Sequence, residues 1–203
     1  MSGQHHGEPE PYPAIRTKAI ESLLIEKGLF TGDAIDAKVQ AYEKDIGPMN
    51  GAKVVARAWV DSGYRERLLA NGREAISEMG FTELQGAELI VHENTRAVHN
   101  VVVCTLCSCY PWSVLGLPPT WYKSFAYRSR VVIEPRKVLK EFGLELEDSV
   151  EVRVWDSNSD IRYMILPERP DGTESMSEDE LVELVSRDSM IGVARAKTPA
   201  QVR

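Results

Sequence analysis

All three cysteines of the 203-residue chain, Cys104, Cys107 and Cys109, lie within the stretch VVVCTLCSCYPW, residues 101 to 112. A disulfide framework requires an even number of cysteines spread along the chain, because each bridge stabilises a fold by closing a loop. Three neighbouring thiols cannot form such a framework. The cysteines are therefore expected to share one local site, and the rest of the chain must fold without cross-links.

Three ordinary explanations of the cluster fit poorly. Structural zinc is usually held by two separated ligand pairs, and the sequence has no second CxxC, although His92 or His99 could complete a Cys3His set. Iron–sulfur clusters generally require four thiolates. Buried inert thiols are the plainest alternative, but they do not normally gather at this density. We therefore expect a metal ion with an unusual donor set.

The flanking residues place the cluster in a loop. The run VVV at 101 to 103 predicts a buried strand, and four residues indicate that no regular element follows: Pro111, Gly116, Pro118 and Pro119. A Cys-Ser-Cys tripeptide brings its backbone nitrogens close to any ion that both sulfurs bind. A strongly acidic trivalent ion can displace amide protons, which gives three sulfur and two nitrogen donors in a square pyramid with a sixth position open.

Charge and hydropathy narrow the class of protein. The 24 Lys and Arg against 31 Asp and Glu give a formal net charge of -7, which repels phosphate backbones. The start MSGQHHGEPEPYP has no apolar core of secretory length, and no apolar run approaches the ~18 residues that a membrane span requires. We expect a soluble cytoplasmic protein that binds neither nucleic acid nor membranes.

Residues 1–47 are predicted to form an N-terminal extension and a helical arm. Helical spacing begins at Ala14 and ends at Gly28, and a second helix runs from the N-cap Thr31 to Gly47. The apolar stripes of the two helices are too sparse to form a core between themselves. We expect the arm to wrap around a partner; the alternative is that it folds back on its own domain.

Residues 48–203 are predicted to form a globular metal-binding catalytic domain. Helices are expected at 52–69 with a break at 61–63, at 74–79, at 135–142 and at 177–185. Short strands are expected at 88–92 and 100–103, and alternation on both sides of residues 157–159 predicts a β-hairpin over 150–166. The fold class is α+β, a mixed α/β layered domain with the metal in the Cys-rich loop.

Four long strings carry a resemblance to one protein family. They are VCTLCSCYPWSVLGLPPTWYKSFAYRSRVV, EPRKVLKEFG, VRVWDSNSDIRYMILPERPDGT and VSRDSMIGV. These strings resemble the α subunit of nitrile hydratase, and weaker similarity extends back to about Ala14. The resemblance implies a low-spin Co(III) or, with less support, Fe(III) ion, one per chain, held by the sulfurs of Cys104, Cys107 and Cys109 and by the backbone amides of Ser108 and Cys109.

The resemblance also implies the chemical state of the cluster. In that family the cysteine matching Cys107 is a cysteine sulfinic acid, the one matching Cys109 is a cysteine sulfenic acid, and the one matching Cys104 stays a thiolate. Thr105 and Tyr110 match the cobalt-type pattern, where iron-type members tend to have Ser and Thr. Cobalt is therefore the expected metal.

The implied activity is that of a hydro-lyase, which adds water to a nitrile and yields an amide. The metal acts as a Lewis acid, and the nucleophile is either the sulfenate oxygen of Cys109 or a water activated by the metal. Cys107 and Ser108 complete the catalytic cluster. Gln85 matches a residue that orients groups near the metal, and Trp112 matches a wall of the substrate pocket; without the resemblance, a surface amide and a core aromatic would explain them.

Three charged residues of the predicted hairpin are candidates for an outer network. Asp156 and Arg162 match such a network in the family, although a cross-strand pair explains them nearly as well. Asp160 stands where family members often have Glu and is one methylene shorter. Ser113 replaces the Pro common in YPWPVLGLPP and leaves every ligand intact.

Buried sulfur oxyanions require charged donors. In the family these donors are arginines of a separate β subunit, whereas Arg128, Arg130 and Arg136 of this chain are predicted to be solvated or interface residues. We expect a β subunit partner in an αβ or α2β2 assembly, a heterotetramer in the second case, together with a metal-insertion activator protein.

Two other functions remain open. The metal-binding subunit of thiocyanate hydrolase carries the same cluster, but the position of Trp112 tends to be basic there, as an anionic substrate requires. A non-catalytic metal-binding or metal-transfer module would keep CTLCSC without a pocket, and the aromatic, proline-rich segment after Cys109 argues against it.

Overall fold

The computed structural model describes residues 12–40, 47–81 and 87–202 and divides the chain into two compact units, Met1–Ala41 and Tyr42–Arg203. The first unit contains α1 (Tyr12–Glu26) and α2 (Gly32–Gln40). Gly28 has a φ of 67°, as a glycine that ends a helix requires. The first helix of the predicted arm is therefore confirmed, and so is the second over 32–40; its predicted continuation through residues 41–46 lies outside the described residues. The large hydrophobic side chains that α1 exposes are Tyr12, Ile15, Ile20, Leu23 and Ile25.

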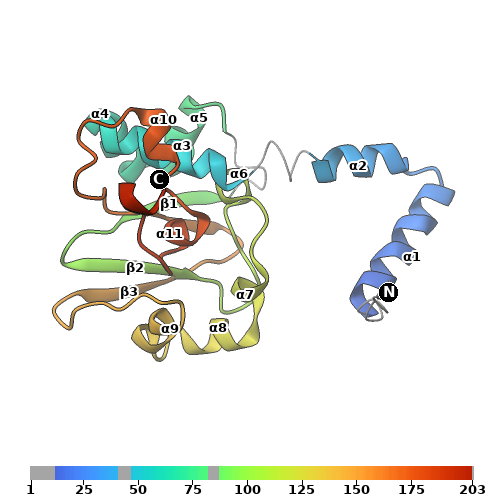
Figure 1. The fold of residues 1–203 in the computed structure, drawn as a ribbon. Helices are drawn as coiled ribbons and strands as arrows, with labels where there is room; N and C mark the ends of the chain where they lie inside the picture. The colour runs from blue at the N-terminus through green and yellow to red at the C-terminus, as the bar shows by residue number, and fades with distance from the viewer. Residues whose placement is uncertain (1–11, 41–46, 82–86, 203) are drawn as a thin grey trace, which may run out of the picture. The chain divides into compact units, whose positions relative to one another are not determined.

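The second unit contains two parallel two-stranded sheets between layers of helices (Figure 1). The strands are β1 (Glu88–Glu93) with β4 (Ile161–Leu166), and β2 (Val98–Val103) with β3 (Glu151–Asp156). One layer comprises α3 (Pro48–Val60), α4 (Ser62–Ala70), α5 (Gly72–Glu78) and α10 (Glu178–Val182). The opposite side carries α8 (Phe125–Arg130) and α9 (Pro135–Glu141). The predicted α+β fold class is confirmed.

The helix ends follow the local sequence rules. Asp61 separates α3 from α4 and accepts a hydrogen bond from the N–H of Tyr64 at 2.9 Å. Ser177 and Glu180 form the predicted capping box at the start of α10. Gly143, which follows α9, has a φ of 84°. Sequence chemistry therefore predicted these boundaries correctly.

The prediction that no regular element follows the cysteines is wrong. Two short helices occur there, α6 (Trp112–Leu115) and α7 (Thr120–Lys123), with Pro111 and Pro119 as their N-cap residues. A proline at a helix start removes no intrahelical hydrogen bond, because the first N–H groups of a helix have no partner within it. The two remaining elements, α11 (Arg187–Ile191) and the 3-10 turn Pro199–Gln201, lie near the end of the chain.

The predicted β-hairpin over residues 150–166 is also wrong. Both strands exist, but β3 pairs with β2 and β4 pairs with β1. The side chain of Asn158 accepts the N–H groups of Asp160 at 2.9 Å and Ile161 at 3.0 Å, and this turn carries the chain from one sheet to the other. Alternation shows that a segment has two faces, but it does not show which strand lies beside it.

Among the described residues of the second unit, one hydrophobic core joins helices, strands and the cysteine loop. It includes Val54 and Val55 of α3, Val103 at the end of β2, and Cys104 and Tyr110 of the loop. The loop is therefore packed against the core at both ends, as a site on a rigid scaffold requires.

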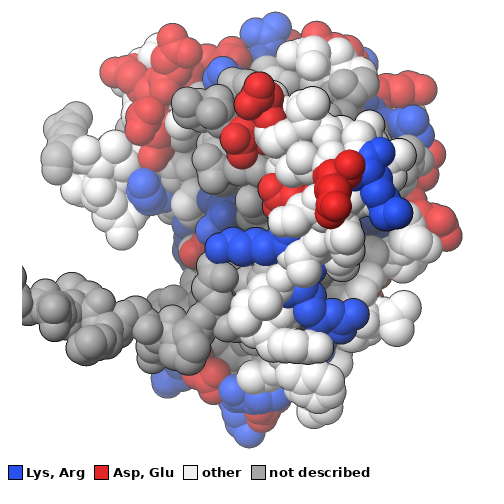
Figure 2. Space-filling view, turned by 90° about the vertical axis from the view of Figure 1, so that its right-hand side faces the viewer, with Lys and Arg blue, Asp and Glu red and all other residues white. Residues whose placement is uncertain are grey.

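The described helices include none that is both long and apolar enough to cross a membrane. The face shown in Figure 2 carries both Lys and Arg side chains and Asp and Glu side chains, with uncharged surface between them. The described residues of this face therefore do not present a single sign of charge.

Substitution of Gly192 tests the close packing of α11 against β2. Gly192 has a φ of 92°, and a Cβ there would collide with the carbonyl oxygen of Asn100. We expect Gly192→Ala to lower the free energy of unfolding by about 3 kcal/mol or more, because strain and overlap add. Urea denaturation followed by tryptophan fluorescence measures this loss.

Gly172→Ala is the matched control. Gly172 has a φ of 77°, but nothing lies within 4 Å of the added Cβ, so that only the conformational cost of about 1 kcal/mol applies. Equal losses in the two variants would contradict the proposed overlap.

Candidate metal centre

The cysteine loop begins where the β2–β3 ladder ends. Val103 is the last residue of β2 and pairs with Asp156, the last residue of β3. Cys104 follows directly and is fully buried, Cys107 is exposed and Cys109 is half-buried. The cluster therefore extends from the core to the surface of the unit, with one fixed sulfur and two accessible ones.

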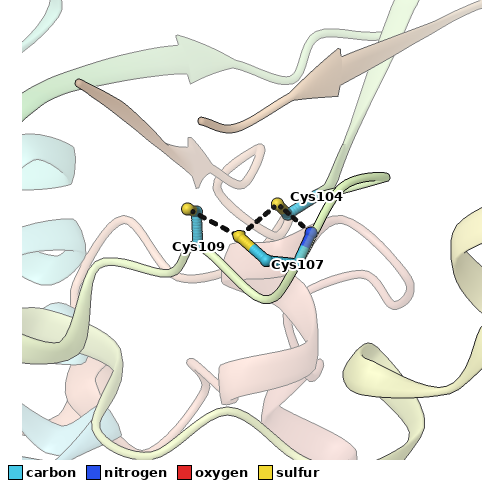
Figure 3. Close-up of side chains that lie close together, drawn as sticks. All are labelled: Cys104, Cys107 and Cys109. Atoms are coloured by element: carbon cyan, nitrogen blue, oxygen red, sulfur yellow. Dashed lines mark hydrogen bonds between the residues drawn. The ribbon is translucent and has the colours of Figure 1, made fainter. Parts of the chain in front are cut away.

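The three sulfurs point toward one another (Figure 3). The Sγ atom of Cys107 lies 3.4 Å from that of Cys104 and 3.1 Å from that of Cys109, and all three lie within 4.8 Å of one another. Sulfurs about 2.3 Å from an ion lie about 3.3 Å apart when bound at right angles and about 3.8 Å apart around a tetrahedron. The two short separations fit ligands at right angles.

The backbone amides of the loop face the same centre. The N–H of Cys107 lies 3.3 Å from the Cys104 sulfur, and the N–H groups of Ser108 and Cys109 interact with the Cys107 sulfur. Three sulfurs, with the amides of Ser108 and Cys109 beside them, therefore form a candidate donor set for a metal. Such a soft, electron-rich donor set suits a transition metal that is a strong Lewis acid.

The two histidines that could have completed a zinc site lie elsewhere. His99 is buried, and its Nε2 lies 2.7 Å from the carbonyl oxygen of Gly192. The ring of His92 stacks on Trp155 with centroids 3.6 Å apart. Among the described residues, the only His, Cys, Asp or Glu group of at least three with metal-site spacing is the cysteine cluster itself.

The surroundings of Cys107 and Cys109 shift the pKa values of their thiols in opposite directions. The Cys109 thiol, the Cys104 thiol and the amides of Ser108 and Cys109 hydrogen-bond to the Cys107 sulfur and lower the pKa of Cys107 to about 7. Burial and the neighbouring Cys107 sulfur raise the pKa of Cys109 to about 12. Cys107 is therefore the more reactive of the two thiols in the metal-free protein.

Three side chains from separate elements hold the loop backbone. Asp156 accepts hydrogen bonds from the N–H of Thr105 at 2.8 Å and from its hydroxyl at 2.6 Å. Tyr122 of α7 donates to the carbonyl oxygen of Cys109 at 3.0 Å, and Arg128 of α8 donates to that of Cys107 at 3.1 Å. The prediction that Arg128 is solvated or at an interface missed this contact.

Asp156 and Arg162 do not form the cross-strand pair considered as an alternative, because their strands belong to different sheets. Arg162 is buried, donates to the carbonyl oxygen of Asn158, and its charge lowers the pKa of Cys109 against the larger effect of burial. Asp160 is exposed. Asp156 thus contacts the cysteine loop directly, whereas Arg162 acts on Cys109 through its charge.

Trp112 and Gln85 are the last two predicted site residues. Trp112 is half-buried at the start of α6, three positions after Cys109, and packs against the core. Gln85 lies outside the described residues. Arg130 and Arg136, which were predicted to be solvated or at an interface, contact their own unit. Arg130 pairs with Glu134 and Glu141, and Arg136 donates to the backbone carbonyls of residues 146, 147, 148 and 150.

Comparisons with known proteins agree on one family. The family model described as nitrile hydratase, alpha chain, matches residues 11–194. The chain is 56% identical over 200 residues to the high-molecular weight cobalt-containing nitrile hydratase subunit alpha of Rhodococcus rhodochrous, covering 98% of each. It is 43% identical over 191 residues to thiocyanate hydrolase subunit gamma of Thiobacillus thioparus, covering 88% of this chain and 78% of that one. A double mutant of the Fe-type nitrile hydratase from Comamonas testosteroni Ni1 superposes with a TM-score of 0.88 at 42% identity, covering 95% and 94% of the chains.

Alkylation of the metal-free chain tests the acidity of Cys107. At pH 7 about half of Cys107 is thiolate, so we expect iodoacetamide to label Cys107 at least about tenfold faster than Cys109. The Cys107 rate should rise between about pH 6 and pH 8 and then level off, because a lowered pKa brings the thiolate transition into that range. Peptide mass spectrometry after timed quenching measures both rates.

Cys109→Ser serves as the matched variant, since it removes the thiol that does most to lower the pKa of Cys107. Labelling of Cys107 at pH 7 should slow in this variant. Faster labelling of Cys109 than of Cys107 in the unsubstituted chain would refute the assignment.

Proposed function

Because the chain belongs to the nitrile hydratase α-chain family, we propose that it is the metal-carrying α subunit of a cobalt-containing nitrile hydratase, a hydro-lyase that converts nitriles into amides. The observation that carries this proposal is the cluster of Cys104, Cys107 and Cys109, whose sulfurs lie within 4.8 Å of one another. A Lewis-acidic metal held by these residues would supply polarisation of a nitrile and activation of a nucleophile.

Cobalt(III) is the proposed ion, one per chain, and Fe(III) is less favoured. The proposed ligands are the three cysteine sulfurs and the amide nitrogens of Ser108 and Cys109, with Cys107 as sulfinate and Cys109 as sulfenate. The iron-type relative shares the fold, so the fold does not select the metal. The preference for cobalt is supported by Thr105 and Tyr110 and by the cobalt-containing relative of Rhodococcus rhodochrous.

The roles of the chain's own residues follow from their positions. Trp112, three positions after the half-buried Cys109, is proposed to supply an apolar wall of the substrate pocket, which suits a neutral nitrile. Asp156 and Tyr122 hold the loop backbone, and Arg162 places positive charge near the Cys109 sulfur. Gln85 is proposed to orient groups near the metal on the strength of the sequence match.

A β subunit is the proposed partner, in an αβ or α2β2 assembly. Leu106 within the loop is 85% exposed and Phe125 at the start of α8 is 80% exposed, so the face beside the cluster has apolar surface that a partner would cover. Sulfur oxyanions covered in this way require cationic donors from the partner. We further propose that residues 1–47 form a partner-wrapping arm attached to a catalytic domain at 48–203.

The proposal also covers how the chain obtains its metal and where it is located. A metal-insertion activator protein would load the cobalt, since the donors include amide nitrogens that bind only after losing a proton. A cytoplasmic location suits three cysteines that form no disulfide among themselves.

The second candidate function is hydrolysis of thiocyanate. It is supported by the relative from Thiobacillus thioparus, which is less similar than the nitrile hydratase subunit. Thiocyanate is an anion, whereas Trp112 offers an apolar surface. We therefore place thiocyanate second, and a non-catalytic metal-transfer module third.

Metal content and substrate class test the proposal together. The complex co-expressed with its β subunit in cobalt-supplemented medium should contain close to one cobalt per α chain by emission spectrometry. It should convert neutral nitriles to amides and leave thiocyanate nearly unchanged. Stoichiometric zinc without cobalt or iron would refute the catalytic proposal, and efficient release of ammonia and carbonyl sulfide from thiocyanate would favour the second candidate.

Two substitutions separate the reacting sulfur from the pocket wall. Cys109→Ser removes a metal ligand and the sulfenate oxygen, so we expect kcat to fall at least about a hundredfold. Trp112→Ala should retain turnover and change the ratio of kcat/KM between aromatic and aliphatic nitriles by about tenfold. Steady-state amide production measures both effects, with cobalt content determined in parallel.

Near-normal turnover by a cobalt-loaded Cys109→Ser complex would limit the Cys109 sulfur to a structural role. An unchanged nitrile preference in Trp112→Ala would remove Trp112 from the pocket.

A further inference from the structure

The peptide group between Cys107 and Ser108 has a charged partner. Arg128 donates from Nη1 to the carbonyl oxygen of Cys107 at 3.1 Å, with a weaker contact to that of Thr105 at 3.5 Å. The guanidinium also lies over the ring of Phe125, 5.6 Å from its centroid, and its Nε atom is buried. Arg128 is thus a cation held against the loop and partly removed from water.

The contact fixes the direction of the Ser108 amide. In a trans peptide the C=O and N–H groups point in opposite directions, and the described chain contains no cis peptide bond. When the Cys107 oxygen points toward Arg128, the N–H of Ser108 must point away from it. That N–H lies against the Cys107 sulfur, on the side where the three sulfurs converge.

The charge of Arg128 matches the charge that ligation creates. When the Ser108 nitrogen binds a metal, the N–H bond is replaced by a nitrogen–metal bond, and the proton leaves to solvent. The peptide group then carries one negative charge, shared between its nitrogen and the Cys107 oxygen. A guanidinium cannot lose its proton in a protein, and a hydrogen bond between two charged groups is about twice as strong as a neutral one.

The neighbouring carbonyl provides an internal comparison. The Cys109 oxygen accepts its hydrogen bond from the neutral hydroxyl of Tyr122, and the nitrogen of that peptide group belongs to Tyr110, which is not a proposed ligand. The charged donor is therefore placed at one of the two peptide groups that ligation would make anionic, and a neutral donor at one that stays neutral.

We propose that Arg128 is a positioning residue for the metal: it aims the Ser108 amide at the cysteine cluster and compensates the negative charge of the bound amide. This inference rests on the proposed function, because it takes the Ser108 nitrogen as a ligand. The competing explanation is that Arg128 only fastens α8 to the loop, in which case the charge of the donor would not matter and the loss of the contact would lower the stability of the metal-free protein.

The test compares Arg128→Lys, which keeps the charge, with Arg128→Gln, which keeps a donor without charge. Each variant is prepared as the cobalt-loaded complex with the β subunit, and cobalt per chain and the rate of cobalt loss to a chelator are measured by emission spectrometry. We expect Arg128→Gln to lose cobalt about tenfold faster or to load about tenfold less, and Arg128→Lys to recover most of the difference.

Two controls separate charge compensation from folding. Arg130→Met removes a guanidinium from the same helix, where it pairs with Glu134 and Glu141, and should keep wild-type cobalt retention. The metal-free Arg128→Gln complex should melt within a few degrees of the metal-free wild type, because its folded state needs no compensation of an amide charge.

Wild-type cobalt retention in Arg128→Gln would overturn the inference while leaving the proposed function intact. Cobalt loss in Arg128→Gln that Arg128→Lys does not reduce, accompanied by an equal loss of metal-free stability, would also overturn it in favour of the fastening role. If the wild-type complex itself bound no cobalt or iron, the proposed function would fail instead, so the two failures are distinguishable.

Discussion

The parallel pairing of β2 with β3 is the constraint on which the metal centre depends. The ladder ends with Val103 beside Asp156, so the first cysteine leaves the sheet from a buried position and the carboxylate of Asp156 lies next to the loop that follows. Asp156 then accepts both the N–H and the hydroxyl of Thr105. A shift of one residue in this register would turn Asp156 to the opposite face and remove the contact.

The cysteine loop is held through its backbone as much as through its side chains. Its polar groups are bound by β3, α7 and α8, which contribute Asp156, Tyr122 and Arg128. A metal site that uses amide nitrogens needs this arrangement, because peptide planes must be oriented as accurately as side chains. The short helices after the cysteines matter for this reason: α7 carries Tyr122, and Ser124 at its end caps α8, which carries Arg128.

The family alone does not select the metal or the substrate, because iron-type and thiocyanate-hydrolysing relatives share its fold or sequence. In our proposal, individual residues near the cluster select the metal and the substrate. Thr105 and Tyr110 favour cobalt, and the apolar surface of Trp112 favours a neutral nitrile over an anion. The exposed Leu106 and Phe125 indicate that the same face is completed by a partner.

The sequence by itself determined whatever depends on short-range chemistry. Asp61, Ser177 and Gly143 marked the helix ends correctly, and the spacing of the three cysteines predicted a local site. Alternation located β3 and β4 but wrongly joined them in a hairpin, because strand pairing depends on residues far away in the chain. The contacts of Asp156 with Thr105 and of Arg128 with Cys107 span 51 and 21 residues, so only the tertiary structure could bring these groups to the loop.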